Sequence, residues 1–145
     1  FDFGFNKFVG KKFPNKEWPQ THWDELGKML SGRFSFSVQR HLDDLTGYIE
    51  WIDSCRALIT CDSLGLHIGL ALEKRVILLI GPSSSAEIPG NGNLRVLKPH
   101  PPGDCSPCCL PECGRDDPCM KYISPLAVFE VLKEWADRGA GGDRC

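Results

Sequence analysis

The sequence predicts an α/β fold with an open parallel sheet and helices on both faces. Two short apolar runs, residues 57–60 and 76–80, are each bounded by polar or Gly/Pro residues, which is typical of strands buried on both faces of a parallel sheet. The segment between them, residues 66–72, is apolar nearly all round and predicts a crossover helix packed deep against the sheet. Strand and helix patterns alternate along the chain, and their connections are too long for hairpins.

The first third of the chain predicts two strands and two helices. Phenylalanines alternate with polar residues or glycine over residues 1–6, so we expect an opening strand with one face in the core. Residues 19–30 begin with a proline and continue with apolar residues at spacings of three and four, which predicts an amphipathic helix. A short strand over residues 34–39 and a second amphipathic helix over residues 42–52 then lead into the central unit.

The last third predicts one more strand and one more helix. Residues 94–97 can add a strand to the sheet. Ser124 is placed to cap a helix that has Pro125 at its first position, and we expect this helix to bury a stripe that begins with Leu126.

Composition and charge limit the class of protein. A chain of 145 residues with 41% hydrophobic content fits one domain, which we place at residues 1–138, followed by a flexible tail at residues 139–145. The net charge of −2 argues against a nucleic-acid partner. Charged residues 73–75 interrupt the longest apolar stretch, so we expect a soluble protein with no transmembrane segment. Because the chain begins with Phe rather than Met, we expect it to be a piece of a longer protein.

The turn after the first core strand, Cys61 to His67, is the predicted centre of the chemistry. Ligands of such a unit lie outside the carboxyl ends of the strands, where this turn emerges. Asp62 or Ser63 can cap the following helix, and Gly65 allows a ligand to approach the backbone closely. The free amides of the first turn attract an anion such as a phosphate, and His67 faces the same opening. The alternative is that Asp62 and Ser63 only cap the helix and that His67 is a half-buried packing residue.

Two loops at the same edge offer further binding groups. The loop at residues 7–16 carries four lysines, including Lys16, and a flexible ammonium group can contact phosphate oxygens. The alternative is an ordinary solvated lysine loop. The loop that begins at Gly81 has three consecutive serines, and we take Ser83 as its candidate residue because a hydroxyl can bond a sugar or a phosphate.

Five of the eight cysteines lie within residues 105–119. The length of the chain and its aliphatic content favour a reducing compartment over a secreted disulfide scaffold. One option is a structural zinc held by four thiolates in this Cys-rich loop, although the second pair is spaced more widely than in the usual zinc ribbon. The favoured alternative is a set of reduced, partly buried thiols. The four candidate ligands are Cys105, Cys108, Cys113 and Cys119.

Taken together, these segments resemble the C-terminal half of glycosyltransferase family 9, which includes the ADP-heptose lipopolysaccharide heptosyltransferases. The resemblance covers nearly the whole chain and rests on three stretches: GFNKFVGKKFPNKEWP, LITCDSLGLHIGLALEKRVILLIGPSSSAEI, and CSPC to CMKYIS with its trailing helix. The specific part is the central one, where an apolar strand is followed by Asp-Ser, Gly and His in fixed order, then by an apolar helix, a strand and Gly-Pro-Ser.

The resemblance implies a Rossmann-like domain that forms one half of a GT-B glycosyltransferase and holds the nucleotide-sugar donor. Family members transfer a sugar with inversion, here a heptose from an ADP-sugar to a lipopolysaccharide core acceptor, without a required cofactor. Their catalytic base and their lipid-linked saccharide acceptor belong to an N-terminal domain that this chain does not contain, so no catalytic residue is expected here. The donor-binding residues carried over are Lys16, Asp62, Ser63, Gly65 and His67.

One feature departs from the family. The route from Leu30 to Leu45 is too short for the glycine-rich strand end with its acidic residue, so part of the nucleotide pocket is not accounted for. The resemblance places the protein in the cytoplasm, with peripheral association at the inner face of the cytoplasmic membrane as an option. The competing function is a zinc-stabilised α/β interaction module without catalysis. The absence of a Walker-type or dinucleotide glycine motif argues against a different nucleotide-dependent enzyme.

Overall fold

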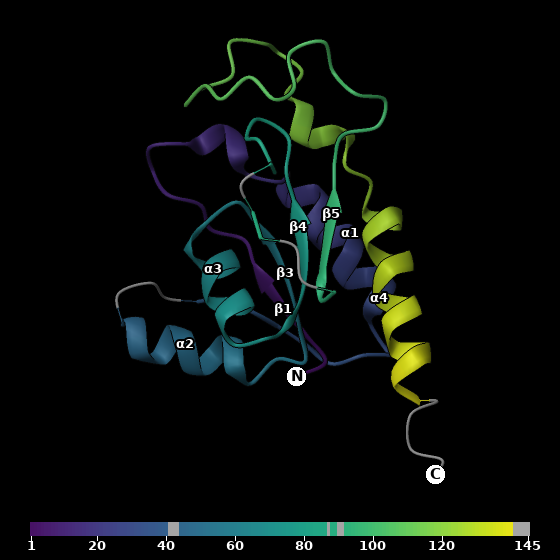
Figure 1. Cartoon of the computed structure of the whole chain (residues 1–145). Coiled ribbons are helices and arrows are strands. Elements are labelled where there is room, and N and C mark those ends of the chain that lie inside the picture. The colour runs from purple at the N-terminus through teal and green to yellow at the C-terminus, as the bar shows by residue number, and fades with distance from the viewer. Residues whose placement is uncertain (41–43, 87, 90–91, 141–145) are drawn as a thin grey trace.

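The computed structural model describes residues 1–40, 44–86, 88–89 and 92–140. Its described strands form one sheet in the order β2-β1-β3-β4-β5, and every neighbouring pair is parallel. Helices α1 and α4 cover one face of the sheet and α2 and α3 cover the other (Figure 1). The predicted fold class is therefore confirmed. The strands are β1 (Phe3–Asn6), β2 (Phe36–Val38), β3 (Ala57–Cys61), β4 (Arg75–Leu79) and β5 (Leu94–Leu97), and the helices are α1 (Gln20–Leu30), α2 (Leu45–Asp53), α3 (Leu64–Ala71) and α4 (Pro125–Ala140).

The core has two halves, one on each face of the sheet. Under α1 and α4, Phe5 packs between Trp23 and Phe36, with ring centroids 5.4 and 4.8 Å away. Under α2 and α3, Ile52 and Leu66 pack on the opposite face of the strands. All five residues of β3 are buried, which explains why this strand reads as a continuous apolar run.

Three local predictions are wrong. The opening strand does not have one solvated face, because β1 lies between β2 and β3 and all four of its residues are buried. Leu126 is 53% exposed, and Val128 takes its place in the core. Helix α4 continues through Ala140, so it includes the first two residues of the predicted tail. Residues 141–145 and the predicted helical residue Leu42 lie outside the described residues.

Helix ends follow local sequence signals. Asp44 caps α2 by accepting a hydrogen bond from the Thr46 amide, and the Ser124 hydroxyl caps α4 by accepting from the Leu126 amide at 3.1 Å.

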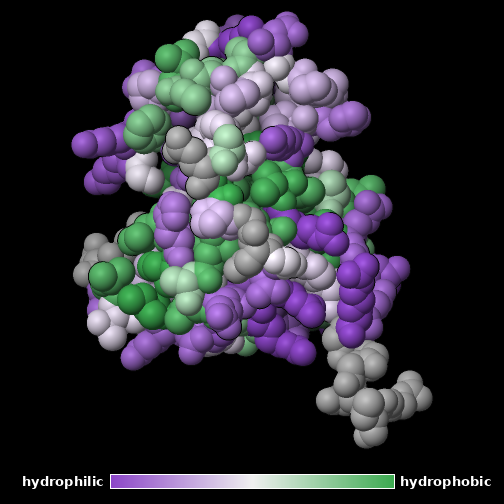
Figure 2. Space-filling model, viewed as in Figure 1, coloured by the Kyte–Doolittle hydropathy of each residue, from purple (hydrophilic) through white to green (hydrophobic). Residues whose placement is uncertain are grey.

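Hydrophobic side chains gather on the side of the molecule where α2 and α3 lie (Figure 2), and on α2 these include the exposed Leu45 and Ile49. No helix within the described residues is both long and apolar enough to cross a membrane.

The Cys-rich loop crosses the carboxyl edge of the sheet, at the top of Figure 1. It lies between β5 and the short 3-10 helix η2 (Cys119–Tyr122). Its Cys109 amide donates to the Pro82 carbonyl at 2.7 Å, and its Leu110 carbonyl accepts from the side chain of Asn15. Asn15 belongs to the 3-10 helix η1 (Pro14–Lys16), so the Cys-rich loop contacts both of the loops predicted to bind a ligand.

Candidate functional site

Lys16 and Asp62 meet at the carboxyl edge of the sheet. Lys16 ends η1 and Asp62 follows β3, and the Lys16 Nζ lies 2.6 Å from Asp62 Oδ2. Both side chains are about four-fifths buried, with 20% and 21% of their surface exposed. Burial alone would raise the pKa of Asp62, but the hydrogen bonds from Lys16 and Ser83 and the charge of Lys16 outweigh it and hold that pKa below its usual value. Asp62 is therefore ionised at neutral pH.

Ser83 and His67 are the other members of this cluster, and of the two His67 is exposed. Ser83 follows β4, bonds Asp62, and lines a cavity of about 450 Å³ together with Lys98 and Ser106. His67 is exposed on α3, and its electrostatic effect on Asp62 also lowers the pKa of that carboxyl group. The alternative of a half-buried packing histidine is thus wrong. The structure brings Lys16 and Asp62 into direct contact, with Ser83 and His67 close enough to influence the Asp62 carboxyl group.

Ser63 and Gly65 face into the protein rather than toward the cluster. Ser63 occupies the N-cap position of α3, yet its side chain makes no capping bond within the described chain, and its Oγ instead accepts a hydrogen bond from Asn6 Nδ2 at 2.9 Å. Of the two residues predicted as possible caps, Asp62 or Ser63, Ser63 occupies the N-cap position but does not cap the helix with its side chain. A Cβ atom at Gly65 would lie 2.3 Å from Asn6 Nδ2 and 2.4 Å from the Tyr48 hydroxyl. Internal packing alone thus requires a glycine there, and its role toward a ligand stays a prediction.

Asn6 is the residue that the sequence analysis missed. Its amide group is fully buried and donates to Thr60 Oγ1 at 2.7 Å as well as to Ser63, while the Tyr48 hydroxyl donates to its Oδ1 at 2.8 Å. Burial raises the pKa of Tyr48 to about 12, with the hydrogen bond to Asn6 acting in the opposite direction. The sequence did show a polar residue at the end of the first strand. Because Asn6 alternates with phenylalanines, however, the period-two pattern predicted that its side chain faces solvent.

The first turn of α3 has unused hydrogen-bond donors. The Leu66 amide bonds the Ser63 carbonyl at 3.1 Å, whereas the amides of Leu64 and Gly65 have no partner in the part of the chain that the structure describes. Such amides, together with the helix dipole, favour an anion. They lie in the same short turn as Asp62.

A second missed residue, Gln39, lies in a cavity of about 510 Å³ at the end of β2. Its side chain is 3% exposed, and neither of its polar atoms has a partner among the described residues. Tyr48 and Trp51 line the same cavity with their rings parallel, at a centroid distance of 6.1 Å and an interplanar angle of 8°. A buried amide without a partner costs free energy unless a ligand or water bonds it.

The four candidate zinc ligands lie near one another but are not arranged as a metal site. Cys105 and Cys119 line one cavity, and burial, followed by the charges of Cys105, Cys108 and Cys113, raises the pKa of Cys119. All four thiols are free, and no group of three or more His, Cys, Asp or Glu residues in the described chain is placed to hold a metal ion. The geometry does not fit a preformed zinc centre, and the zinc option remains an untested prediction.

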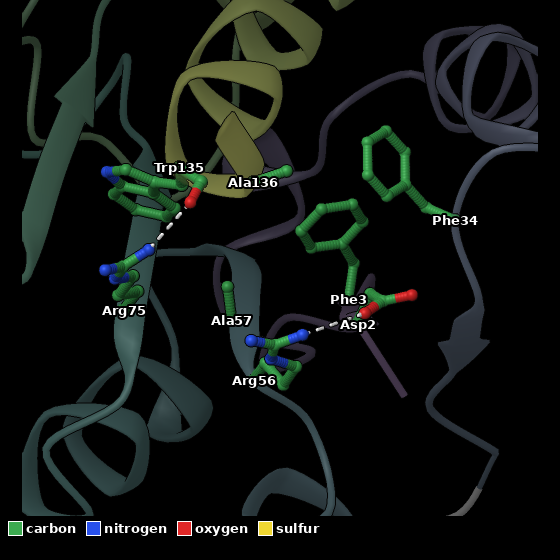
Figure 3. Close-up of a pocket in the computed structure, with 8 residues that line it drawn as sticks. All are labelled: Asp2, Phe3, Phe34, Arg56, Ala57, Arg75, Trp135 and Ala136. Atoms are coloured by element: carbon green, nitrogen blue, oxygen red, sulfur yellow. Dashed lines mark hydrogen bonds and ion pairs between the residues drawn. The ribbon is translucent and has the colours of Figure 1, made fainter. Parts of the chain in front are cut away.

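A further cavity of about 370 Å³ lies at the opposite edge of the sheet (Figure 3). The guanidinium of Arg75 donates to the Trp135 carbonyl at 3.0 Å, and Arg56 pairs with Asp2 at 3.6 Å. None of the predicted ligand-binding residues lines this cavity. The groups described above therefore all belong to the carboxyl edge.

The parallel sheet, its flanking helices and the polar cluster at its carboxyl edge together define an open α/β domain with a candidate ligand site at that edge. No protein-family model matches the sequence, and no curated protein matches it either. Solved structures do match. E. coli ADP-heptose lps heptosyltransferase II is 21% identical with a TM-score of 0.68, and E. coli heptosyltransferase WaaC with ADP is 19% identical with a TM-score of 0.63. The glycosyl transferase family 9 protein from Veillonella parvula DSM 2008 is 16% identical with a TM-score of 0.61.

These matches confirm the expected resemblance to family 9 and to its GT-B members at the level of the fold. They cover 91% of this chain but only 45%, 43% and 44% of the three solved chains, respectively. The chain therefore spans less than half the length of the proteins that it resembles.

Proposed function

We propose that this chain holds the nucleotide-sugar donor of an inverting glycosyltransferase, with an ADP-sugar such as ADP-heptose as donor and a lipopolysaccharide core saccharide as acceptor. The observation that carries the proposal is the pairing of two features at one edge of the sheet. One is an anion-attracting turn beside Lys16 whose first amides have no partner in the described chain. The other is an adjoining cavity where the buried amide of Gln39 has none among the described residues. A nucleoside diphosphate has an anionic diphosphate that matches the turn and a planar polar base that matches the cavity.

The arrangement suggests a place for each part of the donor. The diphosphate lies against the first turn of α3 and Lys16, and the nucleoside enters the cavity of Gln39, where Tyr48 and Trp51 form an aromatic wall. The carboxylate of Asp62 repels phosphate, so it is better suited to accept hydrogen bonds from sugar hydroxyls, next to the serines of the cavity lined by Ser83.

Chemically, this site serves the leaving group. Backbone amides and a lysine stabilise the negative charge that develops on the diphosphate as the sugar–phosphate bond breaks, and they do so without a metal. The acceptor and the base that activates it must approach the sugar from the side opposite the leaving group. We assign both to a second domain, in keeping with the greater length of the solved structures.

Calorimetric titration of the chain with ADP, ADP-heptose and inorganic pyrophosphate tests the proposal. Gln39→Leu should weaken ADP binding by roughly ten-fold while leaving pyrophosphate affinity within about two-fold, because only the nucleoside loses a partner. Lys11→Ala, which removes an exposed lysine from the same loop as Lys16, should bind all three ligands like the parent.

Absence of saturable ADP binding at millimolar concentration would reject the proposal. The close grouping of the four cysteines favours one second candidate, a zinc-stabilised interaction module. One equivalent of tightly bound zinc combined with no nucleotide affinity would select that module.

A further inference from the structure

Ser63 stands at the start of α3 with the backbone of a capping residue but without a capping bond. Its φ of −151° and ψ of 177° are the extended values typical of an N-cap, where a serine oxygen normally accepts from the second or third amide of the helix. Here that oxygen accepts from Asn6. We propose that Asn6 is a positioning residue that turns the Ser63 hydroxyl away from α3 and so leaves the first amides of the helix free for the anionic part of the ligand. The inference rests on the proposed function for the identity of that ligand.

The orientation of the Asn6 amide is set by its neighbours. The Thr60 hydroxyl donates to the Cys61 carbonyl at 2.8 Å, so its oxygen is left as an acceptor for Asn6 Nδ2. On the other side, the Tyr48 hydroxyl donates to Oδ1. Because Thr60 and Tyr48 fix the orientation of the Asn6 amide group, the second proton of its Nδ2 points to the Ser63 hydroxyl oxygen. Asn6, Thr60 and Tyr48 are all at least 96% buried, so water does not compete for these bonds.

The helix start is held directly against this group. A Cβ at Gly65 would overlap both Asn6 and Tyr48, so the first turn of α3 rests on their polar atoms. Tyr48 also lines the cavity of Gln39. The same buried hydrogen-bond chain therefore connects the two regions that would hold the two ends of a nucleoside diphosphate.

A ligand-free measurement tests the positioning role first. Amide hydrogen exchange followed by NMR should show the Leu64 and Gly65 amides unprotected in the parent chain. In Asn6→Ala the released Ser63 hydroxyl should cap the helix and slow exchange at Gly65 or Leu66 several-fold. Tyr48→Phe is the matched control, since it removes a different buried bond of Asn6 and leaves the Ser63 contact in place; it should keep the parent exchange pattern.

Binding of inorganic pyrophosphate supplies the second readout. Asn6→Ala should weaken it by roughly three- to thirty-fold, the effect of a typical serine cap competing for the same amides. Adding Ser63→Ala to Asn6→Ala should restore most of the lost affinity, because the competing oxygen is gone. A purely structural role for Asn6 predicts the opposite, since a second truncation would only add to the damage.

The outcomes separate this inference from the proposed function. Protected Leu64 and Gly65 amides in the parent chain would overturn the positioning role even if Asn6→Ala does not fold. Lack of rescue in the double variant would also overturn it. If the exchange pattern follows the expectation but neither pyrophosphate nor ADP binds the parent, the proposed function fails while the role of Asn6 in uncapping the helix stands.

Discussion

Replacing Lys16 with methionine tests the ion pair at the centre of the candidate site. The substitution keeps an unbranched apolar side chain of similar length but removes the ammonium group 2.6 Å from Asp62. If Lys16 were an exposed lysine, its loss would leave stability unchanged. Because both side chains are about 80% buried, we instead expect the variant to be less stable at neutral pH.

The magnitude follows from the geometry. A charge-assisted hydrogen bond contributes about 1.5–3 kcal/mol, and the remaining exposure of both groups lets water replace part of it. We therefore expect Lys16→Met to lower the free energy of unfolding by about 1–2 kcal/mol at pH 7. Pyrophosphate affinity should fall by roughly ten-fold as well, because the ligand loses the same ammonium group.

The pH dependence identifies the source of the effect. The native pKa of Asp62 lies below its unfolded value, so its stabilisation is fully present above about pH 4 and is lost as the pH falls through the native pKa. Burial is already the largest single influence on this carboxyl group, and without Lys16 it is opposed by the Ser83 hydrogen bond and the electrostatic effect of His67, so the pKa of Asp62 rises. The stability difference between parent and variant should therefore be largest at neutral pH and should shrink toward zero as Asp62 becomes protonated.

Urea unfolding of both chains at pH 7 and near pH 3 measures this difference. Lys11→Met is the control, since it removes an equal charge from an exposed position of the same loop and should have little effect at either pH. A variant as stable as the parent at pH 7, or one with the same deficit at both pH values, would refute the reasoning.

Three further predictions follow from the packing, the cysteines and the division of the site between domains. Gly65→Ala should destabilise the chain by about 2–4 kcal/mol in chemical denaturation, because a methyl group displaces buried hydrogen bonds, whereas Gly10→Ala, with no described atom within 4 Å of the new Cβ, should be close to neutral. Thiol titration after unfolding without reductant, with and without a chelator, should find Cys105, Cys108, Cys113 and Cys119 reactive, and fewer than four reactive thiols from this loop would count against reduced cysteines. The chain alone should show no sugar transfer from donor to acceptor in a turnover assay, and measured turnover would contradict the assignment of the base to another domain.

The fold was accessible from the sequence because its central strands β3 and β4 are short and largely buried. The apolar runs that became β3 and β4 have no solvated side, so their pattern predicted a parallel sheet directly. The meeting of Lys16 with Asp62 could also be anticipated, since the carboxyl ends of parallel strands share one edge.

The polar interior of the site could not be predicted in the same way. Asn6 bonds partners 42 to 57 residues away, and nothing in its own neighbourhood distinguishes it from a polar residue on the solvated face of an edge strand. The orientation of Ser63 depends on that distant amide and overrides its local preference for capping. Gln39 is notable only because its buried amide has no partner within the described part of the chain, and burial of that amide arises only on folding.

The contacts that η1 and the nearby Trp18 make with the distal part of the chain have a consequence for how the molecule folds. Trp18 Nε1 donates to the Ile123 carbonyl across 105 residues, and Asn15 reaches Leu110 across 95 residues. Contacts of such sequence separation form late, since the entropy of closing a long loop must be overcome before they contribute. During synthesis, Lys16 leaves the ribosome more than ninety residues before Leu110, whose carbonyl bonds the neighbouring Asn15 in η1. The central sheet can therefore assemble first, and the edge that carries the candidate site becomes fixed only when the C-terminal third of the chain has joined it.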